Sequence, residues 1–141
     1  MSLQTRLTTL AHGNNLSALK NIVRGIEKES LRVEASGRMA ATPHPSALGS
    51  AMTHPSITTD YSEALLEFIT APSASIDEVL NELEEIHSYT YQQIGQELLW
   101  VSSMPCQLGD DSSIPVGQYG SSNNGTMKPS TVLASAIATA V

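Results

Sequence analysis

The longest periodic segment of the sequence, residues 75–100, constrains the fold most, because it predicts one long amphipathic helix. Ser75 followed by Glu78 is the pattern of a capping box at a helix N-terminus. Apolar residues then recur at helical spacing, namely Ile76, Val79, Leu80, Leu83, Ile86, Ile94 and Leu98. A helix with one apolar side needs a second layer to cover that side, so the rest of the chain must supply it.

Residues 21–34 predict a strand of that second layer. The segment is rich in β-branched side chains, which favour extended backbone: Ile22, Val23, Ile26 and Val33. Ser36 and Gly37 follow as a turn, so we expect a hairpin whose second strand is "RMAAT", residues 38–42.

The segment "YSEALLEFIT", residues 61–70, suits either a helix face or a buried strand. As a helix it would stack Glu63 on Glu67 at i,i+4, which is a destabilising like-charge pair. We therefore predict a strand over residues 65–70.

The remaining segments complete a single α+β domain. Residues 2–11 predict a short helix with Ser2 as its N-cap, and residues 43–59, rich in Pro, Ser, Thr and Gly, predict a long surface loop. A chain of 141 residues is the size of one ordinary domain. We expect a mainly antiparallel sheet with flanking helices, the longest of them near residues 75–100.

The charge and cysteine content exclude several classes of protein. The net charge is −7, with 14 acidic and 7 basic residues and no cluster of Lys or Arg, which argues against a nucleic-acid-binding protein. No apolar run reaches the roughly 20 residues that a membrane span needs. The single cysteine, Cys106, has no partner for an internal disulfide, and no signal peptide opens the sequence, so we expect a cytoplasmic protein.

Glu27 and Glu29 place two carboxylates on an apolar strand face. Alternate side chains share a face, so both glutamates project to the same side as Val23, Leu31 and Val33. Unpaired carboxylates are costly to bury and repel one another, so either the face is wet or a cation lies between them. A hard divalent cation such as Mg²⁺ meets that need, because it takes carboxylate oxygens and shares them with nucleotide phosphates.

A simpler interpretation of Glu27 and Glu29 stays open. Two glutamates near a strand often face solvent, or form ion pairs with basic neighbours, here Arg24, Lys28 or Arg32.

Two further acids strengthen the metal interpretation. Asp60 ends the long loop and Glu67 lies within an apolar stretch, although Asp60 is also an ordinary helix N-cap candidate. Three other acids, Glu63, Glu82 and Glu85, are expected on the solvated surface.

Other candidate motifs carry no assignment. The residues His44, His54, His87 and Cys106 show no metal-ligand spacing and no catalytic arrangement. The loop-like "GQYGSSNNG", residues 117–125, matches neither a P-loop nor a dinucleotide fingerprint. We therefore assign no catalytic residue and no nucleotide-binding residue.

Four stretches of the sequence, in order, resemble the start of the proteobacterial glutamate-cysteine ligases, also called γ-glutamylcysteine synthetases. These stretches are "RGIEKESLRV", "ATPHPSALGSAMTHPSITTDYSEALLEFIT", "ELLWVSSMPC" and "QYGSSNNG". The resemblance runs from about residue 16 to residue 125, and "THPSITTDYSEALLEFIT" is its most specific part.

The resemblance implies an ATP-dependent ligase that performs the first step of glutathione biosynthesis. In that family ATP phosphorylates the γ-carboxylate of L-glutamate, and the amine of L-cysteine displaces the phosphate, giving γ-glutamylcysteine, ADP and phosphate. The implied fold is a curved antiparallel sheet similar to that of glutamine synthetase, with Mg²⁺ on its concave face. Metal ligands of the family fall on Glu27, Glu29, Asp60 and Glu67, and Tyr61 is expected near the cysteine side chain.

The resemblance ends after residue 125. Residues 1–125 are expected to be the N-terminal part of the ligase catalytic domain, and residues 126–141 a tail that arises from truncation or a frameshift. Such a chain would hold a sheet cut partway and only part of the cation cage. We therefore expect little ligase activity from it, and an unpaired sheet edge through which copies can associate.

Three alternatives to an active ligase stay open from the sequence. The chain could be a non-catalytic fragment that binds Mg²⁺ or nucleotide weakly, an interaction-only remnant, or one part of a split enzyme completed by a second chain.

Overall fold

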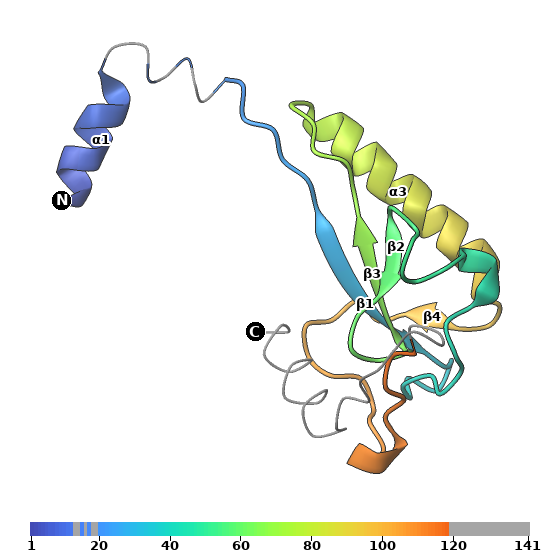
Figure 1. Ribbon diagram of the computed structural model, residues 1–141. Helices are drawn as coiled ribbons and strands as arrows, with labels where there is room; N and C mark the ends of the chain where they lie inside the picture. The colour runs from blue at the N-terminus through green and yellow to red at the C-terminus, as the bar shows by residue number, and fades with distance from the viewer. Residues whose placement is uncertain (13–14, 16, 18–19, 119–141) are drawn as a thin grey trace.

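A computed structural model describes the chain except for residues 13–14, 16, 18–19 and 119–141. Its centre is a four-stranded antiparallel sheet in the order β2-β3-β1-β4. The strands are β1 (Glu27–Val33), β2 (Ile57–Thr59), β3 (Leu65–Ile69) and β4 (Leu98–Leu99). The helix α3 (Ile76–Gln93) lies along one face of the sheet, while α1 (Leu3–Ala11) stands apart from it (Figure 1). Two short 3₁₀ turns, η1 (Ser46–Leu48) and η2 (Asp111–Ser113), lie in the loops.

The register of β1 and β3 decides which side chains share a face. The Arg32 N–H donates to the Ala64 carbonyl at 2.6 Å, and the Thr70 N–H donates to the Ile26 carbonyl at 3.0 Å. The even-numbered residues of β1 therefore form the hydrogen-bonded pairs with β3, and the odd-numbered residues form the pairs whose side chains approach more closely. Glu29 faces Glu67 in one of these close pairs.

The face of the sheet that α3 covers is an apolar core. It consists of Leu48, Ile57, Leu66, Phe68, Ile86, Ile94 and Leu99, with Leu83 packed against it. The Phe68 ring is fully buried, and the His87 ring of α3 meets it edge-on with centroids 4.8 Å apart. Burial of these side chains between α3 and the sheet is the main source of stability in this half of the molecule.

A second, smaller cluster lies at one end of the opposite face. It contains Val33, Met39, Ala64, Cys106 and Ile114, with Leu31, Tyr61, Trp100, Leu108 and Val116 packed against it. Leu31 and Val33 alternate with the even-numbered residues of β1, so this cluster shares its face with Glu27 and Glu29. The loop of residues 100–116 therefore covers only one end of that face.

The predicted α+β class is confirmed, and so are two elements in particular. The helix α1 begins after Ser2, whose hydroxyl accepts the Thr5 N–H at 3.2 Å, as its N-cap role predicts. The predicted strand at residues 65–70 is β3.

The predicted start of the long helix is confirmed, whereas its predicted end is wrong. The Ser75 hydroxyl accepts the Glu78 N–H, whereas the Glu78 carboxylate accepts the Ser73 hydroxyl rather than closing a full capping box. The helix ends at Gln93 instead of residue 100, because Gly95 adopts a φ of 66° and turns the chain into β4. A glycine tolerates this left-handed conformation at little cost, and it is a common helix stop.

Three other predictions about the sheet need correction. The strand of residues 21–34 is regular only over Glu27–Val33. The hairpin partner at residues 38–42 is shorter than predicted: it consists of one bridge between Val33 and Met39, with hydrogen bonds from the Glu34 N–H to the Arg38 carbonyl and from the Ala40 N–H to the Arg32 carbonyl. The long loop of residues 43–59 contains the edge strand β2, which pairs with β3.

No helix among the described residues has the length and apolar character that a membrane crossing requires. The expected tail of residues 126–141 lies outside the described residues, as do Tyr119 and Ser121 of the "QYGSSNNG" stretch.

Candidate metal-binding face

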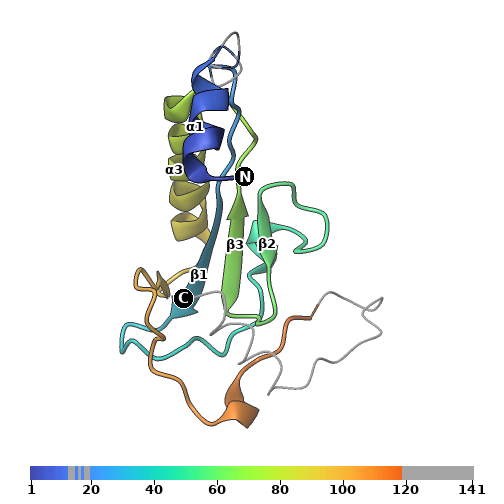
Figure 2. The same ribbon diagram turned by 90° about the vertical axis from the view of Figure 1, so that its left-hand side faces the viewer.

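The four acids singled out from the sequence lie on one face of the sheet, the face that α3 leaves uncovered. Glu27 and Glu29 alternate along β1, and Glu67 of β3 lies directly opposite Glu29. Thr58 of β2 pairs with Glu67, so Asp60, two residues further on, follows on the same side. Figure 2 views the sheet from the side away from α3, where β1, β3 and β2 lie side by side. The alternation argument from sequence is thus confirmed for Glu27 and Glu29, whereas the placement of Asp60 and Glu67 on the same face follows from the pairing of β3 with β1 and β2.

The Glu29–Glu67 pair forms the middle of this acidic face. As a non-hydrogen-bonded cross-strand pair, its Cβ atoms lie roughly 4.5–5.5 Å apart, and like charges at that spacing destabilise a sheet. Both side chains are half-buried rather than free in solvent. The arrangement is therefore unfavourable unless something positive offsets it.

The same conflict shifts the pKa values of these acids upward. Burial raises the pKa of Glu67, and the charges of Asp60 and the two β1 glutamates raise it further. Burial also raises the pKa of Glu29, with added repulsion from Asp60 and Glu27. The pKa of Asp60 is raised by burial and partly restored by a hydrogen bond from the Tyr61 backbone. Each group is thus a carboxylate that would gain from a nearby cation.

The basic neighbours do not supply that cation, so the ion-pair interpretation of Glu27 and Glu29 is wrong among the described residues. The alternative that they face solvent holds for Glu27, which is exposed, and not for Glu29, which is half-buried. Among the described residues the one ion pair joins Arg32 to Glu97, at 2.5 Å. The Lys28 ammonium lies on the α3 side, where it donates to the Ser30 hydroxyl and lies 5.7 Å from the centre of the Phe68 ring. A guanidinium nitrogen of Arg24 donates to the Ile22 carbonyl.

The donor set suits a hard divalent cation shared with other ligands. In the described part of the chain, no three His, Cys, Asp or Glu side chains lie close enough together to hold one metal ion by themselves. Mg²⁺ is usually bound by one or two carboxylates, with waters and substrate phosphates completing its shell, rather than by a protein-only cage. An acidic face made of carboxylate pairs fits that mode of binding.

Tyr61 lies at the tip of the β2–β3 hairpin, directly after Asp60. Its φ of 56° makes it the one non-glycine residue in the left-handed region among those described. Such a conformation costs roughly 1–2 kcal/mol and persists only where surrounding contacts hold it. Here the Ser62 N–H donates to the Asp60 carbonyl at 2.6 Å, and the Gly117 N–H donates to the Tyr61 carbonyl at 2.7 Å. The half-buried Tyr61 ring packs against the second apolar cluster.

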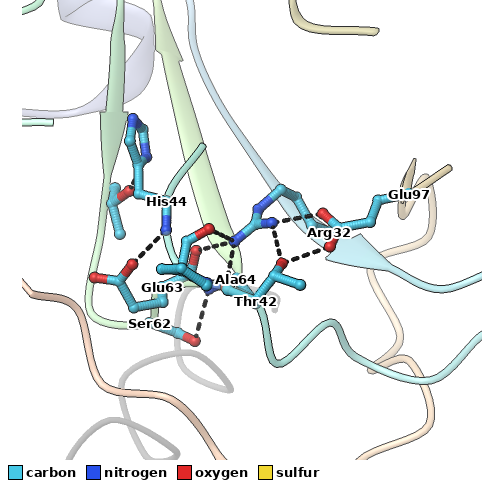
Figure 3. A network of polar contacts seen from close by, with 9 residues as sticks. Arg32, Thr42, His44, Ser62, Glu63, Ala64 and Glu97 are labelled. Carbon is cyan, nitrogen blue, oxygen red and sulfur yellow. Dashed lines mark hydrogen bonds and ion pairs between the residues drawn. The ribbon is translucent and has the colours of Figure 1, made fainter. Parts of the chain in front are cut away.

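A buried polar network lies beneath this hairpin, and sequence reasoning missed it (Figure 3). Arg32 is 1% exposed, and its guanidinium donates to the Glu97 carboxylate, to Thr42 and to the carbonyls of Pro43 and Glu63.

Glu63, expected on the solvated surface, is instead 5% exposed, so that prediction is wrong. Its carboxylate accepts backbone N–H groups from His44 and Gln118. These partners are 19 and 55 residues away in sequence, so no local pattern could have revealed them. Of the other two acids expected on the surface, Glu85 is exposed and Glu82 is half-buried.

Comparison with known proteins identifies a matching family. The family model described as glutamate-cysteine ligase matches residues 7–131. The glutamate–cysteine ligase of Alcanivorax borkumensis is 58% identical over 126 residues, which cover 89% of this chain and 24% of that protein. The glutamate–cysteine ligase of Pseudomonas aeruginosa strain PAO1 is 51% identical over 126 residues, which again cover 89% of this chain and 24% of that protein. The chain thus spans about a quarter of the length of these curated relatives.

Two solved structures share the fold. The crystal structure of glutamate–cysteine ligase from Francisella tularensis in complex with AMP superimposes with a TM-score of 0.70 at 43% identity. The superposition covers 77% of this chain and 22% of the Francisella chain. A bifunctional glutathione synthetase from Pasteurella multocida gives a TM-score of 0.71 at 36% identity, over 77% of this chain and 15% of that one.

Proposed function

The chain belongs to the glutamate-cysteine ligase family, and we propose that its acidic face holds the divalent cations that this ligation needs beside ATP. The reaction we assign to the whole protein is the ATP-dependent joining of the γ-carboxylate of L-glutamate to the amine of L-cysteine. Its products are γ-glutamylcysteine, ADP and phosphate, and it is the first step of glutathione biosynthesis.

One observation carries the proposal: four carboxylates share the face of the sheet opposite α3, and no basic side chain among the described residues pairs with them. Transfer of a phosphoryl group is accelerated mainly by positioning and by cations that offset the charge on the transferred group. Bound Mg²⁺ would supply that charge. The Francisella relative was solved with AMP, which supports a nucleotide partner for this family member.

We assign each residue of the face a role in binding. Glu29 and Glu67, directly opposite one another, hold one cation between two strands. Glu27 extends the face along β1, and Asp60 extends it at the end of β2. Tyr61 presents its ring next to Asp60, where we propose that it contacts the cysteine side chain.

The binding proposal is tested by titrating the chain with Mg²⁺, with and without ATP, in a calorimeter. The Glu67→Gln and Glu27→Gln variants remove one carboxylate each from the face, and Glu85→Gln is the control, because Glu85 is an exposed acid on α3. We expect at least tenfold weaker Mg²⁺ binding in the first two variants and none of that loss in the control. Equal affinity in all variants would mean that the −7 net charge attracts Mg²⁺ nonspecifically.

A ligation assay addresses the reaction itself. We expect the 141-residue chain to form little γ-glutamylcysteine from ATP, L-glutamate and L-cysteine, because its segment corresponds to about a quarter of its relatives. Rapid ATP-dependent product formation by the purified chain would contradict this expectation and the interpretation as a binding segment.

Two further properties follow from the fold as proposals. Within the described part of the chain, the edge strand β2 pairs with β3 alone, so copies of the chain are expected to associate through that edge at high concentration, which light scattering can detect. The free, buried Cys106 agrees with a reducing, cytoplasmic location, as expected from the sequence.

A further inference from the structure

The hairpin tip that carries Asp60 and Tyr61 is strained, so some part of the molecule must hold it in place. Tyr61 has a positive φ, and its own hairpin contributes hydrogen bonds from the Ser62 N–H to the Asp60 carbonyl, from the Asp60 N–H to the Leu65 carbonyl and from the Leu65 N–H to the Ser62 carbonyl. The carbonyl of Tyr61 itself is held from outside the hairpin, by the Gly117 N–H. Two other segments also contact the residues around the tip, one at residues 115–118 and the other at His44.

The first loop, residues 115–118, runs along the residues that follow the tip. The Gly117 N–H donates to the Tyr61 carbonyl at 2.7 Å, and the Ser62 hydroxyl donates to the Pro115 carbonyl at 2.8 Å. The Glu63 N–H donates to the same Pro115 carbonyl at 2.9 Å. This loop therefore fixes the backbone on the far side of Tyr61.

The second loop reaches the strand that precedes the tip. The His44 imidazole shares a hydrogen bond of 2.7 Å between its Nδ1 atom and the Thr59 hydroxyl, one residue before Asp60. Burial lowers the pKa of His44, so its ring is neutral at pH 7 and carries no charge toward the acidic face.

One side chain joins the two loops. The Glu63 carboxylate accepts the backbone N–H of His44 through Oε2 and the backbone N–H of Gln118 through Oε1. Figure 3 shows the contact with His44. Arg32 donates to the main-chain carbonyl of Glu63 at 2.7 Å, which ties the same residue to β1. Each carboxylate oxygen therefore holds a different loop, and the residue itself lies three positions after Asp60.

We propose that Glu63 is a positioning residue, which holds the Asp60–Tyr61 tip in the conformation that binds cation and substrate. The inference rests on the proposed function, because it gives Glu63 a role toward the acidic face. In this proposal Glu63 does not contact the cation or the substrate. It acts through the two loops that its carboxylate joins. A carboxylate suits this position, since each of its two oxygens accepts a backbone N–H, whereas the amide of Gln has one acceptor oxygen.

The test compares Glu63→Gln with Glu97→Gln in the 141-residue chain. Glu97 is the matched control, because it is also a shielded carboxylate bound to Arg32, but its second partner is Thr42 rather than the loops around the tip. Amide hydrogen exchange followed by NMR reports which backbone groups open, and an NMR titration with Mg²⁺ reports affinity at a temperature where both variants are folded.

The positioning role predicts a specific pair of results for Glu63→Gln. The amides of residues 59–63 and 115–118 exchange at least tenfold faster than in Glu97→Gln, and Mg²⁺ affinity falls at least fivefold relative to that control. Faster exchange at the tip with unchanged Mg²⁺ affinity would reduce Glu63 to a structural residue and overturn the inference. So would equal exchange in the two variants.

The unsubstituted chain separates this inference from the proposed function. If that chain shows no Mg²⁺ affinity, the proposed function fails and the inference is lost with it. If it binds Mg²⁺ and Glu63→Gln binds equally well, the inference alone fails.

Discussion

The two faces of the sheet contribute to stability in opposite directions. On the α3 side, Leu66 and Phe68 are fully buried among apolar partners, so that face gains stability from every contact. On the other side, Glu29 and Glu67 face each other across neighbouring strands with repulsion between them. The same five residues of β3 thus alternate between a core that stabilises the fold and a surface that weakens it. We infer that this surface serves the proposed binding of cations rather than the stability of the fold.

Truncation of the Phe68 ring tests the stabilising face and has the largest expected effect. Phe68→Ala removes a fully buried aromatic ring and leaves a cavity against Ile86 and His87. We expect the free energy of unfolding, measured by urea denaturation, to fall by about 3–5 kcal/mol. A loss below about 1 kcal/mol would show that α3 does not pack on the sheet as described.

Mg²⁺ tests the opposite face, where a ligand should replace the missing stability. If the cation binds only the folded chain, Mg²⁺ at ten times its dissociation constant adds about 1.4 kcal/mol to the free energy of unfolding. We expect thermal melts to show this gain for the unsubstituted chain and for Glu85→Gln, and a smaller gain for Glu67→Gln at the same concentration. A gain of the same size with Na⁺ at matched ionic strength would remove the evidence for a specific site.

The sequence predicted the two faces better than it predicted the ends of the elements. Alternation along residues 27–33 is local, so it placed Glu27 and Glu29 on one face, and the like-charge argument at Glu63 and Glu67 identified β3. The end of α3 was missed because Ile94 and Leu98 continue the helical spacing although Gly95 breaks the helix between them.

The buried network was missed for a different physical reason. Arg32 and Glu63 are 31 residues apart, and Arg32 and Glu97 are 65 apart, so their contacts exist only after the sheet and loops have assembled. Sequence position made Glu63 look like another surface acid. Likewise β2 has only three residues, and its extended state depends on pairing with β3 rather than on its own propensity.

Removal of one carboxylate from the acidic face should have a smaller effect of opposite sign to that of Phe68→Ala. Glu67→Gln keeps the shape of the side chain but removes its repulsion with Glu29 and Asp60. We expect the free energy of unfolding without Mg²⁺ to rise by roughly 0.2–1 kcal/mol at pH 7. Urea denaturation of the unsubstituted chain and of Glu67→Gln measures this difference. A loss of stability in Glu67→Gln would show that Glu67 makes a favourable contact in the cation-free chain.

The pH dependence of stability gives the smallest and most specific test of the contrast between the faces. Folding raises the pKa of Glu29 and Glu67 above 4.5 and that of Asp60 above 3.8, so the folded chain binds more protons than the unfolded chain in that window. The contribution of these groups to stability is therefore largest at pH values below their ordinary pKa values and falls as pH rises through their raised pKa values.

Because Glu67→Gln removes one of these groups and lowers the repulsion on the others, the stability of this variant should fall less steeply between about pH 4 and pH 6. Urea denaturation at intervals across this range measures the two slopes. Saturating Mg²⁺ should reduce or reverse the slope of the unsubstituted chain, since the cation favours the ionised carboxylates that folding alone disfavours. Equal slopes for the two proteins without Mg²⁺ would mean that the acids on this face do not interact.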